Sequence, residues 1–272
     1  MDFNDTPEEA AFRAEARKFL EATCEPKAAG LTDHRLADAA FVKIAKAYQK
    51  KKAEAGFAGI TWAKEHGGRG LAPIFHVIFG QEEAKFNAPS GPFAIGLGMC
   101  IPTMIAFASE EQKKRYVGPA LRGEEIWCQL FSEPSAGSDV AGLRTRAVRE
   151  GDDWIINGQK VWTSGAHYSD YGILLTRTNP DAEKHKGLTM FFVDMKSAGV
   201  EVRPIHQMSG GSNFNEVYFT DVRIPDAQRL GEIGAGWSVA LVTLMNERLA
   251  VGGSPGPDYG EILDLARRLP AA

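Results

Sequence analysis

The stretch LFSEPSAGSD, which spans Leu130 to Asp139, decides how the rest of the chain is interpreted. A strand-like start, Trp127 to Phe131, gives way there to a proline and a run of small residues. Such residues are typical of a surface turn, because proline fixes φ and glycine reaches positive φ without strain. They also leave backbone amides and a small hydroxyl free to approach a flat or phosphorylated ligand closely. Both interpretations stand at this point.

The composition of the 272 residues is that of an ordinary globular protein, with 44% hydrophobic and 24% charged residues. The net charge of -4 creates no basic field, which argues against nucleic acid or an anionic membrane as a partner. The start of the chain lacks the pattern of a signal or transit peptide. No apolar run reaches the roughly 18 residues of a membrane-spanning helix. We therefore expect a soluble, cytoplasmic protein with no membrane insertion.

Cysteine and histidine spacing gives no sign of a metal site. The three cysteines, Cys24, Cys100 and Cys128, are scattered and form no CxxC pair. The six histidines also lack the short spacings that metal ligands require. We expect neither a disulfide framework nor a bound metal.

Residues 1–122 carry helical patterns. Thr6 precedes a proline and is followed three residues later by Glu9, the signature of a capped helix start. Apolar residues then recur at helical spacing, at Phe12, Ala16, Phe19 and Leu20. Further helical stretches cover 36–55 and 74–86, and Ser109 opens another capping box. This part is expected to be an all-α domain.

Residues 123–232 change to alternating patterns. Asn157-Gly158 lies between two strand-like runs and predicts a tight hairpin turn. Additional strands are expected at 143–149, 172–177, 188–194, 200–205 and 216–220. Short strands at this spacing predict an antiparallel β-barrel or sandwich. No GxGxxG follows a strand, which argues against a dinucleotide-binding βαβ fold.

The helical period returns in residues 233–272. Trp237, Ala240, Leu241 and Leu244 form an apolar stripe, which Glu247 and Arg248 interrupt. A carboxylate on such a stripe is costly unless it is paired or functional. Two interpretations of Glu247 therefore remain open: it belongs to an ion-pair network, or it is a catalytic base.

Three motifs, in this order and spacing, resemble the acyl-CoA dehydrogenase family. They are LFSEPSAGSD at 130–139, INGQKVWTSG at 156–165 and VYFTDVRIP at 217–225. The resemblance covers about Thr6 to Gly253. It implies an α+β fold: an N-terminal all-α domain, an antiparallel β-barrel domain and the start of a C-terminal helical bundle. The rest of the family's C-terminal four-helix domain has no counterpart within these 272 residues.

The resemblance also implies an FAD site and assigns residues to it. The positions that match cofactor contacts are Gln129, Phe131, Ser132, Gly137, Ser138, Trp162, Thr163 and Ser164. Ser138 and Arg248 match substrate contacts, with Ser138 beside coenzyme A. Glu247 matches the catalytic base in the subset of the family that carries it on this helix. Gln129 and Ser132 depart from the aromatic residue and the threonine that many members have at these positions.

The function implied is FAD-dependent α,β-dehydrogenation of an acyl-CoA thioester, with electrons passed to an electron-transfer flavoprotein. An acyl-CoA oxidase would share every motif. The alternative is a truncated, non-catalytic homologue or partner subunit that lacks a complete FAD site. A homo- or hetero-oligomer is expected, because apolar surface should be exposed on the helices that contain Trp237 and Leu263.

Overall fold

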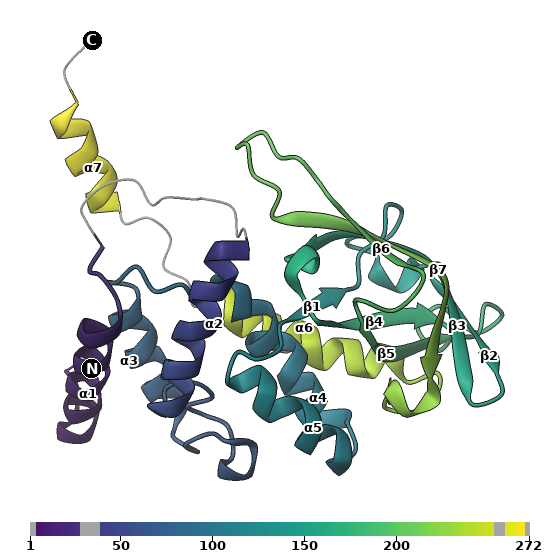
Figure 1. Ribbon diagram of the computed structural model, residues 1–272, viewed down its shortest axis with the longest axis horizontal. Helices are drawn as coiled ribbons and strands as arrows, with labels where there is room; N and C mark the ends of the chain where they lie inside the picture. Colours follow the sequence, from purple (N-terminus) through teal and green to yellow (C-terminus); the bar gives the residue numbers. More distant parts are fainter. Residues whose placement is uncertain (1–3, 28–38, 253–258, 270–272) are drawn as a thin grey trace.

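The structure is a computed structural model and describes residues 4–27, 39–252 and 259–269. Helices α1 to α5 lie on one side of the molecule and the sheet on the other, and α6 runs between them (Figure 1). The main hydrophobic core lies where these parts meet. It joins side chains of α4, the turn after β1, and α6, among them Met104, Phe131, Val140, Val239 and Ala240.

The first helix forms as its sequence predicts. Helix α1 spans Pro7–Thr23, and the Thr6 hydroxyl accepts a hydrogen bond from the Glu9 amide at 3.3 Å. The Glu9 carboxylate accepts the Thr6 amide in return at 2.7 Å, which completes the capping box. Its buried face is Phe12, Ala16 and Leu20. This face packs against α3.

The other elements of the helical part are short. They are α2 (Ala39–Glu54), the 3₁₀ turns η1 (Lys64–His66) and η2 (Gly91–Phe93), α3 (Pro73–Glu83), the π-helical segment η3 (Gly96–Cys100), α4 (Ile101–Phe107) and α5 (Glu110–Leu121). The predicted helices at 36–55, 74–86 and after Ser109 correspond to α2, α3 and α5; residues 36–38 lie outside the described ranges. The segment η3 matters for the site, because it packs against both β1 and α6.

The sheet has eight strands. They are β1 (Trp127–Leu130), β2 (Arg146–Glu150), β3 (Asp153–Ser164), β4 (Tyr171–Arg177), β5 (Leu188–Asp194), β6 (Val200–Pro204), β7 (Phe214–Pro225) and β8 (Arg229–Leu230). The 3₁₀ turns η4 (Val140–Gly142), η5 (Ala166–Tyr168) and η6 (Asp226–Gln228) connect some of them. The pairing order is β6-β7-β3-β2-β4-β5-β8, with β1 added beside β4.

The sheet differs from the expected barrel in two ways. It is mixed, because β1 pairs with β4 in parallel, as does one residue pair between β2 and β4. The chain inserts the β2–β3 hairpin between β1 and β4, which provides the long connection that a parallel pair needs. The sheet is also open: β6 and β8 are the two ends of the pairing order. With only two residues, β8 is too short to close it.

The predicted hairpin at Asn157-Gly158 is wrong. Residues 153–164 form one continuous strand, and the hairpin turn lies instead at 151–152, between β2 and β3. Gly158 marks a register shift against β7, and a Cβ there would lie 2.6 Å from the Thr145 Cα atom. The Asn157 side chain is bonded to Asp221, which has a positive φ of 48°. The bulge at this point lies in β7, where Thr220 and Asp221 oppose the single residue Asn157.

Helix α6 spans Gly236–Gly252 and is rotated slightly from the predicted stripe. Its fully buried residues are Val239, Ala240 and Thr243, whereas Leu241 is 45% exposed. This rotation separates the two charged neighbours: Glu247 is half-buried and Arg248 is exposed. Apolar exposure on α6 and on α7 (Tyr259–Arg268) agrees with expectation, through Leu241, Met245, Ile262 and Leu263.

Candidate functional site

The turn that follows β1 presents its small residues to solvent. Glu133 and Ala136 exchange two backbone hydrogen bonds of 3.0 Å, which close the turn. Gly137 and Ser138 are exposed, and a Cβ added at Gly137 would meet nothing within 4 Å. Phe131 is buried. The turn is thus anchored by its first residues, and its outer part is accessible.

A buried ion pair supports the start of this turn. The Lys160 ammonium, which is 0% exposed, donates to the Phe131 carbonyl and to Glu133 Oε1, both at 2.9 Å. Glu133 also accepts the backbone amides of Arg144 at 2.7 Å and Thr145 at 2.9 Å. Both oxygens of the Glu133 carboxylate therefore accept hydrogen bonds, as a buried charge requires.

Burial and pairing act in opposite directions on these two groups. Burial lowers the pKa of Lys160 to about 8, although the charge of Glu133 opposes this effect. Burial tends to raise the pKa of Glu133, but the Lys160 charge and the hydrogen bonds from residues 144 and 145 hold it below the ordinary value. The carboxylate is thus charged at neutral pH, and it fixes the end of β1 against β3.

The end of β3 carries the second group of predicted residues. A register shift between Lys160 and Thr163 places Trp162 at φ 58°, in the left-handed region that residues with side chains rarely adopt. Its indole is 59% exposed and contacts the ring edge of Phe214, with centroids 6.1 Å apart. Strain of this kind is concentrated at functional sites.

A backbone hydrogen bond also connects the two motifs. The Val161 amide donates to the Ser132 carbonyl at 2.9 Å, next to the Lys160 contact with Phe131. Ser132 and Ser164 are half-buried, and Thr163 is 2% exposed. The predicted residues from both motifs are thus brought together at one end of the sheet.

Helix α6 brings Glu247 to the same region. Gln129, in the middle of β1, donates from Nε2 to Glu247 Oε2 at 3.3 Å. Helix α6 also contacts the helical part, where the buried hydroxyls of Thr243 and Thr103 lie 2.9 Å apart. Arg248 points to solvent and has no hydrogen bond or ion pair with any described residue. Of the two predicted residues on α6, only Glu247 reaches the sheet.

The chemistry of the site fits a flat heteroaromatic cofactor such as FAD. Two buried polar atoms, Gln129 Oε1 and Thr163 Oγ1, have no hydrogen-bond partner among the described residues. Polar atoms in that state are normally satisfied, so each is available to a ligand. The exposed indole of Trp162 offers an aromatic face or edge beside them. The group would therefore be held by Gln129, Thr163, Trp162 and the turn.

Lys160 is a residue that the motif analysis did not single out. It follows Gly158 by two residues and Ile156 by four, so strand alternation places it on the buried face. A lysine on that face is expected only when it is paired. The alternation was the signal that could have identified it.

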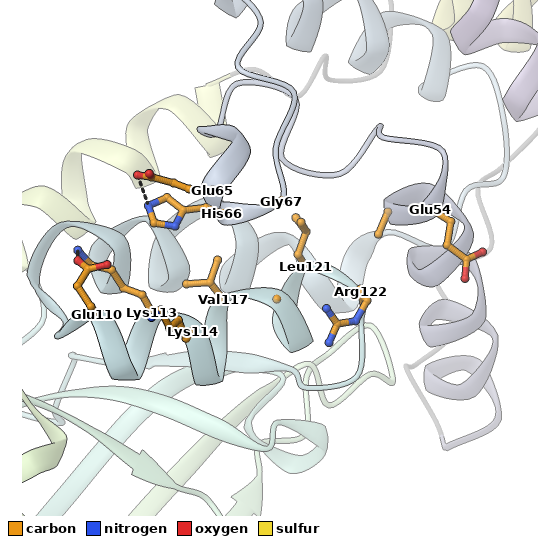
Figure 2. Close-up of a pocket in the computed structure, with 12 residues that line it drawn as sticks. Glu54, Glu65, His66, Gly67, Glu110, Lys113, Lys114, Val117, Leu121 and Arg122 are labelled. Carbon is orange, nitrogen blue, oxygen red and sulfur yellow. Dashed lines mark hydrogen bonds and ion pairs between the residues drawn. The ribbon is translucent and has the colours of Figure 1, made fainter.

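A pocket of about 660 Å³ lies elsewhere, between α2, η1 and α5 (Figure 2). Its lining carries both signs of charge, including Glu65, Glu110, Lys113 and Arg122. None of the predicted site residues lines it. It therefore belongs to the helical part and not to the candidate site.

Within the ranges that the structure describes, no three His, Cys, Asp or Glu side chains converge as metal ligands would. Among the helices described, none combines the length and the apolar character that a membrane crossing demands.

Two family descriptions match the chain in tandem. "Acyl-CoA dehydrogenase, N-terminal domain" matches residues 6–124, and "Acyl-CoA dehydrogenase, middle domain" matches residues 128–222. Together they include the helical part and the sheet up to Val222 in β7.

The chain belongs to the acyl-CoA dehydrogenase family.

Individual relatives agree with this membership. Acyl-CoA dehydrogenase FadE34 of Mycobacterium tuberculosis is 43% identical over 217 residues, which are 78% of this chain and 30% of that protein. Acyl-CoA dehydrogenase IpdE1 of the same organism is 41% identical over 232 residues, 84% of this chain and 60% of the relative. The chain thus spans less than two thirds of these curated relatives.

A solved structure gives the same result. The structure named "Tcur3481-Tcur3483 steroid ACAD" superposes with a TM-score of 0.80 at 30% identity, and the match covers 98% of this chain and 69% of that one. The expected fold is therefore confirmed, with the sheet mixed and open as described above.

Proposed function

We propose that this chain forms the flavin and thioester site of an FAD-dependent acyl-CoA dehydrogenase. The observation that carries the proposal is the convergence of three separate segments. The turn after β1, the Trp162 bulge of β3 and Glu247 of α6 are connected by two hydrogen bonds, Val161 to Ser132 and Gln129 to Glu247. The reaction needs a carboxylate base and a surface that admits a flat cofactor, and Glu247, the accessible turn and the exposed Trp162 would supply them.

The residues have distinct roles in the proposed reaction. Glu247 removes the acidic α-proton of the acyl thioester and holds it on its carboxyl group. When bound, FAD supplies an acceptor for the hydride that leaves the β-carbon. The backbone at Phe131 and Ser132 would hold the polar part of the flavin ring. Trp162 would pack beside the ring, and the hydroxyls of Thr163 and Ser164 would donate hydrogen bonds to it.

The remaining assignments concern the thioester and the partners. Ser138, with Gly137 beside it, is exposed on the turn and would contact coenzyme A; Arg248, exposed on α6, would contact an anionic part of the substrate. Electrons would pass to an electron-transfer flavoprotein. The exposed Leu241 and Met245 on α6 support a homo- or hetero-oligomer in which this helix is covered.

The first experiment is to add FAD to the purified chain and record its visible spectrum, before and after anaerobic addition of a panel of acyl-CoA thioesters. Bound flavin that bleaches with one thioester is the expected result. Glu247→Gln should slow bleaching at least about 100-fold, as loss of a general base does. Glu54→Gln, at the end of α2 in the helical part, is the matched control and should bleach normally.

The other outcomes separate the alternatives. Bleaching followed by rapid reoxidation in air would identify an acyl-CoA oxidase. A colourless protein that cannot take up FAD would contradict the proposal and indicate a non-catalytic partner subunit.

A further inference from the structure

The side chain of Gln129 is in an unusual position, because its two ends differ completely in their surroundings. Its Nε2 donates to Glu247 Oε2 at 3.3 Å. Its Oε1 is buried and has no hydrogen-bond partner within the described part of the chain. A buried acceptor in that state destabilises the fold. A residue that is costly for stability and touches a candidate base calls for a functional explanation.

Chemistry fixes which end of the amide faces Glu247. An ionised carboxylate can only accept hydrogen bonds, so it must meet the NH₂ end of Gln129. The carbonyl end is then directed away from Glu247, into the protein. The unsatisfied Oε1 is thus a direct consequence of the contact with Glu247.

The elements that pack most closely against α6, together with β1, contain few ionisable groups. Helix α6 packs against η3, α4, β4 and β5. The ionisable residues of η3, α4 and β1 are only Cys100 and Cys128, both fully buried, and burial raises the pKa of each. In β4 and β5 the ionisable residues lie at strand ends: Tyr171, Arg177 and Asp194. The neighbouring Arg248 is exposed.

We propose that Gln129 is a positioning residue that holds the Glu247 carboxylate at the end of β1. This inference rests on the function proposed above. A neutral donor orients the carboxylate without adding a cation that would compete for the thioester. A carboxamide can also serve the other protonation state: after a half-turn, its oxygen accepts a hydrogen bond from the carboxylic acid that forms when Glu247 takes the α-proton.

The test follows the Glu247 carboxylate directly, in the chain without added FAD or thioester. Glutamate labelled with ¹³C at the carboxyl carbon is incorporated, and the Glu247 resonance is assigned with Glu247→Gln. In Gln129→Met this resonance is expected to change its chemical shift and to narrow at pH 7, because the carboxylate loses its donor and the side chain gains rotational freedom.

A matched control comes from the same sheet. Gln159 donates to Glu216 Oε1 at 3.1 Å, so Gln159→Met should leave the Glu247 resonance unchanged. Thermal unfolding shows whether each variant folds, and Gln129→Met is expected to be at least as stable as the unmodified chain, since it removes a buried atom without a partner.

The outcomes are decisive for Gln129 alone. An unchanged Glu247 resonance in a folded Gln129→Met chain would overturn the proposal. An equal change in Gln159→Met would also overturn it, because the effect would not be specific. Neither readout requires flavin or substrate. Failure of the flavin experiment and failure of this one are therefore distinguishable.

Discussion

Two carboxylates are buried in the described part of the chain, one in each half of the molecule, and they are paired differently. Glu82, on α3, contacts three cations at its edge: Lys85 at 2.7 Å, Arg17 at 3.0 Å and Arg13 at 3.1 Å. Arg17 and Lys85 are 50% and 56% exposed. Glu133 contacts a single cation, Lys160, which is completely buried.

The difference concerns redundancy. Three cations share the charge of Glu82, and each can be solvated by water if the pair breaks. At the candidate site the charge of Glu133 depends on one ammonium that water cannot replace. The helical part should therefore tolerate the loss of one partner, whereas the site should not.

The largest effect is expected for Lys160→Met. It leaves Glu133 as an unpaired buried charge and should lower the free energy of unfolding by about 3 to 5 kcal/mol, measured by urea denaturation. The double variant Lys160→Met with Glu133→Gln removes that charge and should recover much of the loss. A single-variant loss below about 1 kcal/mol would remove the distinction between the two carboxylates.

A smaller, pH-dependent effect is expected for Glu82→Gln. Burial tends to raise the pKa of Glu82, but the hydrogen bonds from Arg17, Lys85 and Arg13 outweigh it and hold the pKa at about 2. Because this is below the ordinary value of 4.5, the stabilisation is complete above pH 4.5 and is lost as the pH falls through about 2. At pH 7 it amounts to about 3 kcal/mol.

This prediction is checked by comparing urea unfolding of Glu82→Gln and the unmodified chain between pH 7 and pH 2. The gap between their unfolding free energies should shrink below pH 4.5 and close near pH 2. A gap that stays constant would mean that the cations around Glu82 do not stabilise its charged form.

The smallest effect is expected for Arg17→Ala. This guanidinium is half-exposed, and Arg13 and Lys85 still pair with Glu82 when it is removed. The free energy of unfolding should fall by no more than about 1 kcal/mol, measured in the same urea experiment. A loss as large as that of Lys160→Met would show that the three cations act as one unit and are not redundant.

Local patterns predicted most of the secondary structure. The capping box at Thr6 and the helical spacing after it depend only on neighbouring residues, and both are confirmed. The dipeptide Asn157-Gly158 was misleading, because its conformation is set by distant residues: Thr145 leaves no room for a Cβ at Gly158, and Asp221 binds Asn157. The nearest alternative turn, at 151–152, carried the weaker local signal.

The site could be predicted only in part. The motifs indicated which segments belong to it, and the structure joins Val161 to Ser132 and Gln129 to Glu247 by hydrogen bonds. The contact between Gln129 and Glu247 joins residues 118 positions apart, and no local pattern encodes it. The orientation of α6 could not be predicted from the sequence either, because the predicted apolar stripe contained Leu241, which is 45% exposed.

The pair of Lys160 and Glu133 has a consequence for inheritance. It joins two motifs that lie 27 positions apart in the chain. A mutation that changes only one partner leaves the other buried without its ion pair. Lineages that carry such a mutation should be eliminated unless the second change follows quickly. The two motifs are therefore expected to pass through evolution as a single unit, with exchanges at 133 and 160 occurring together.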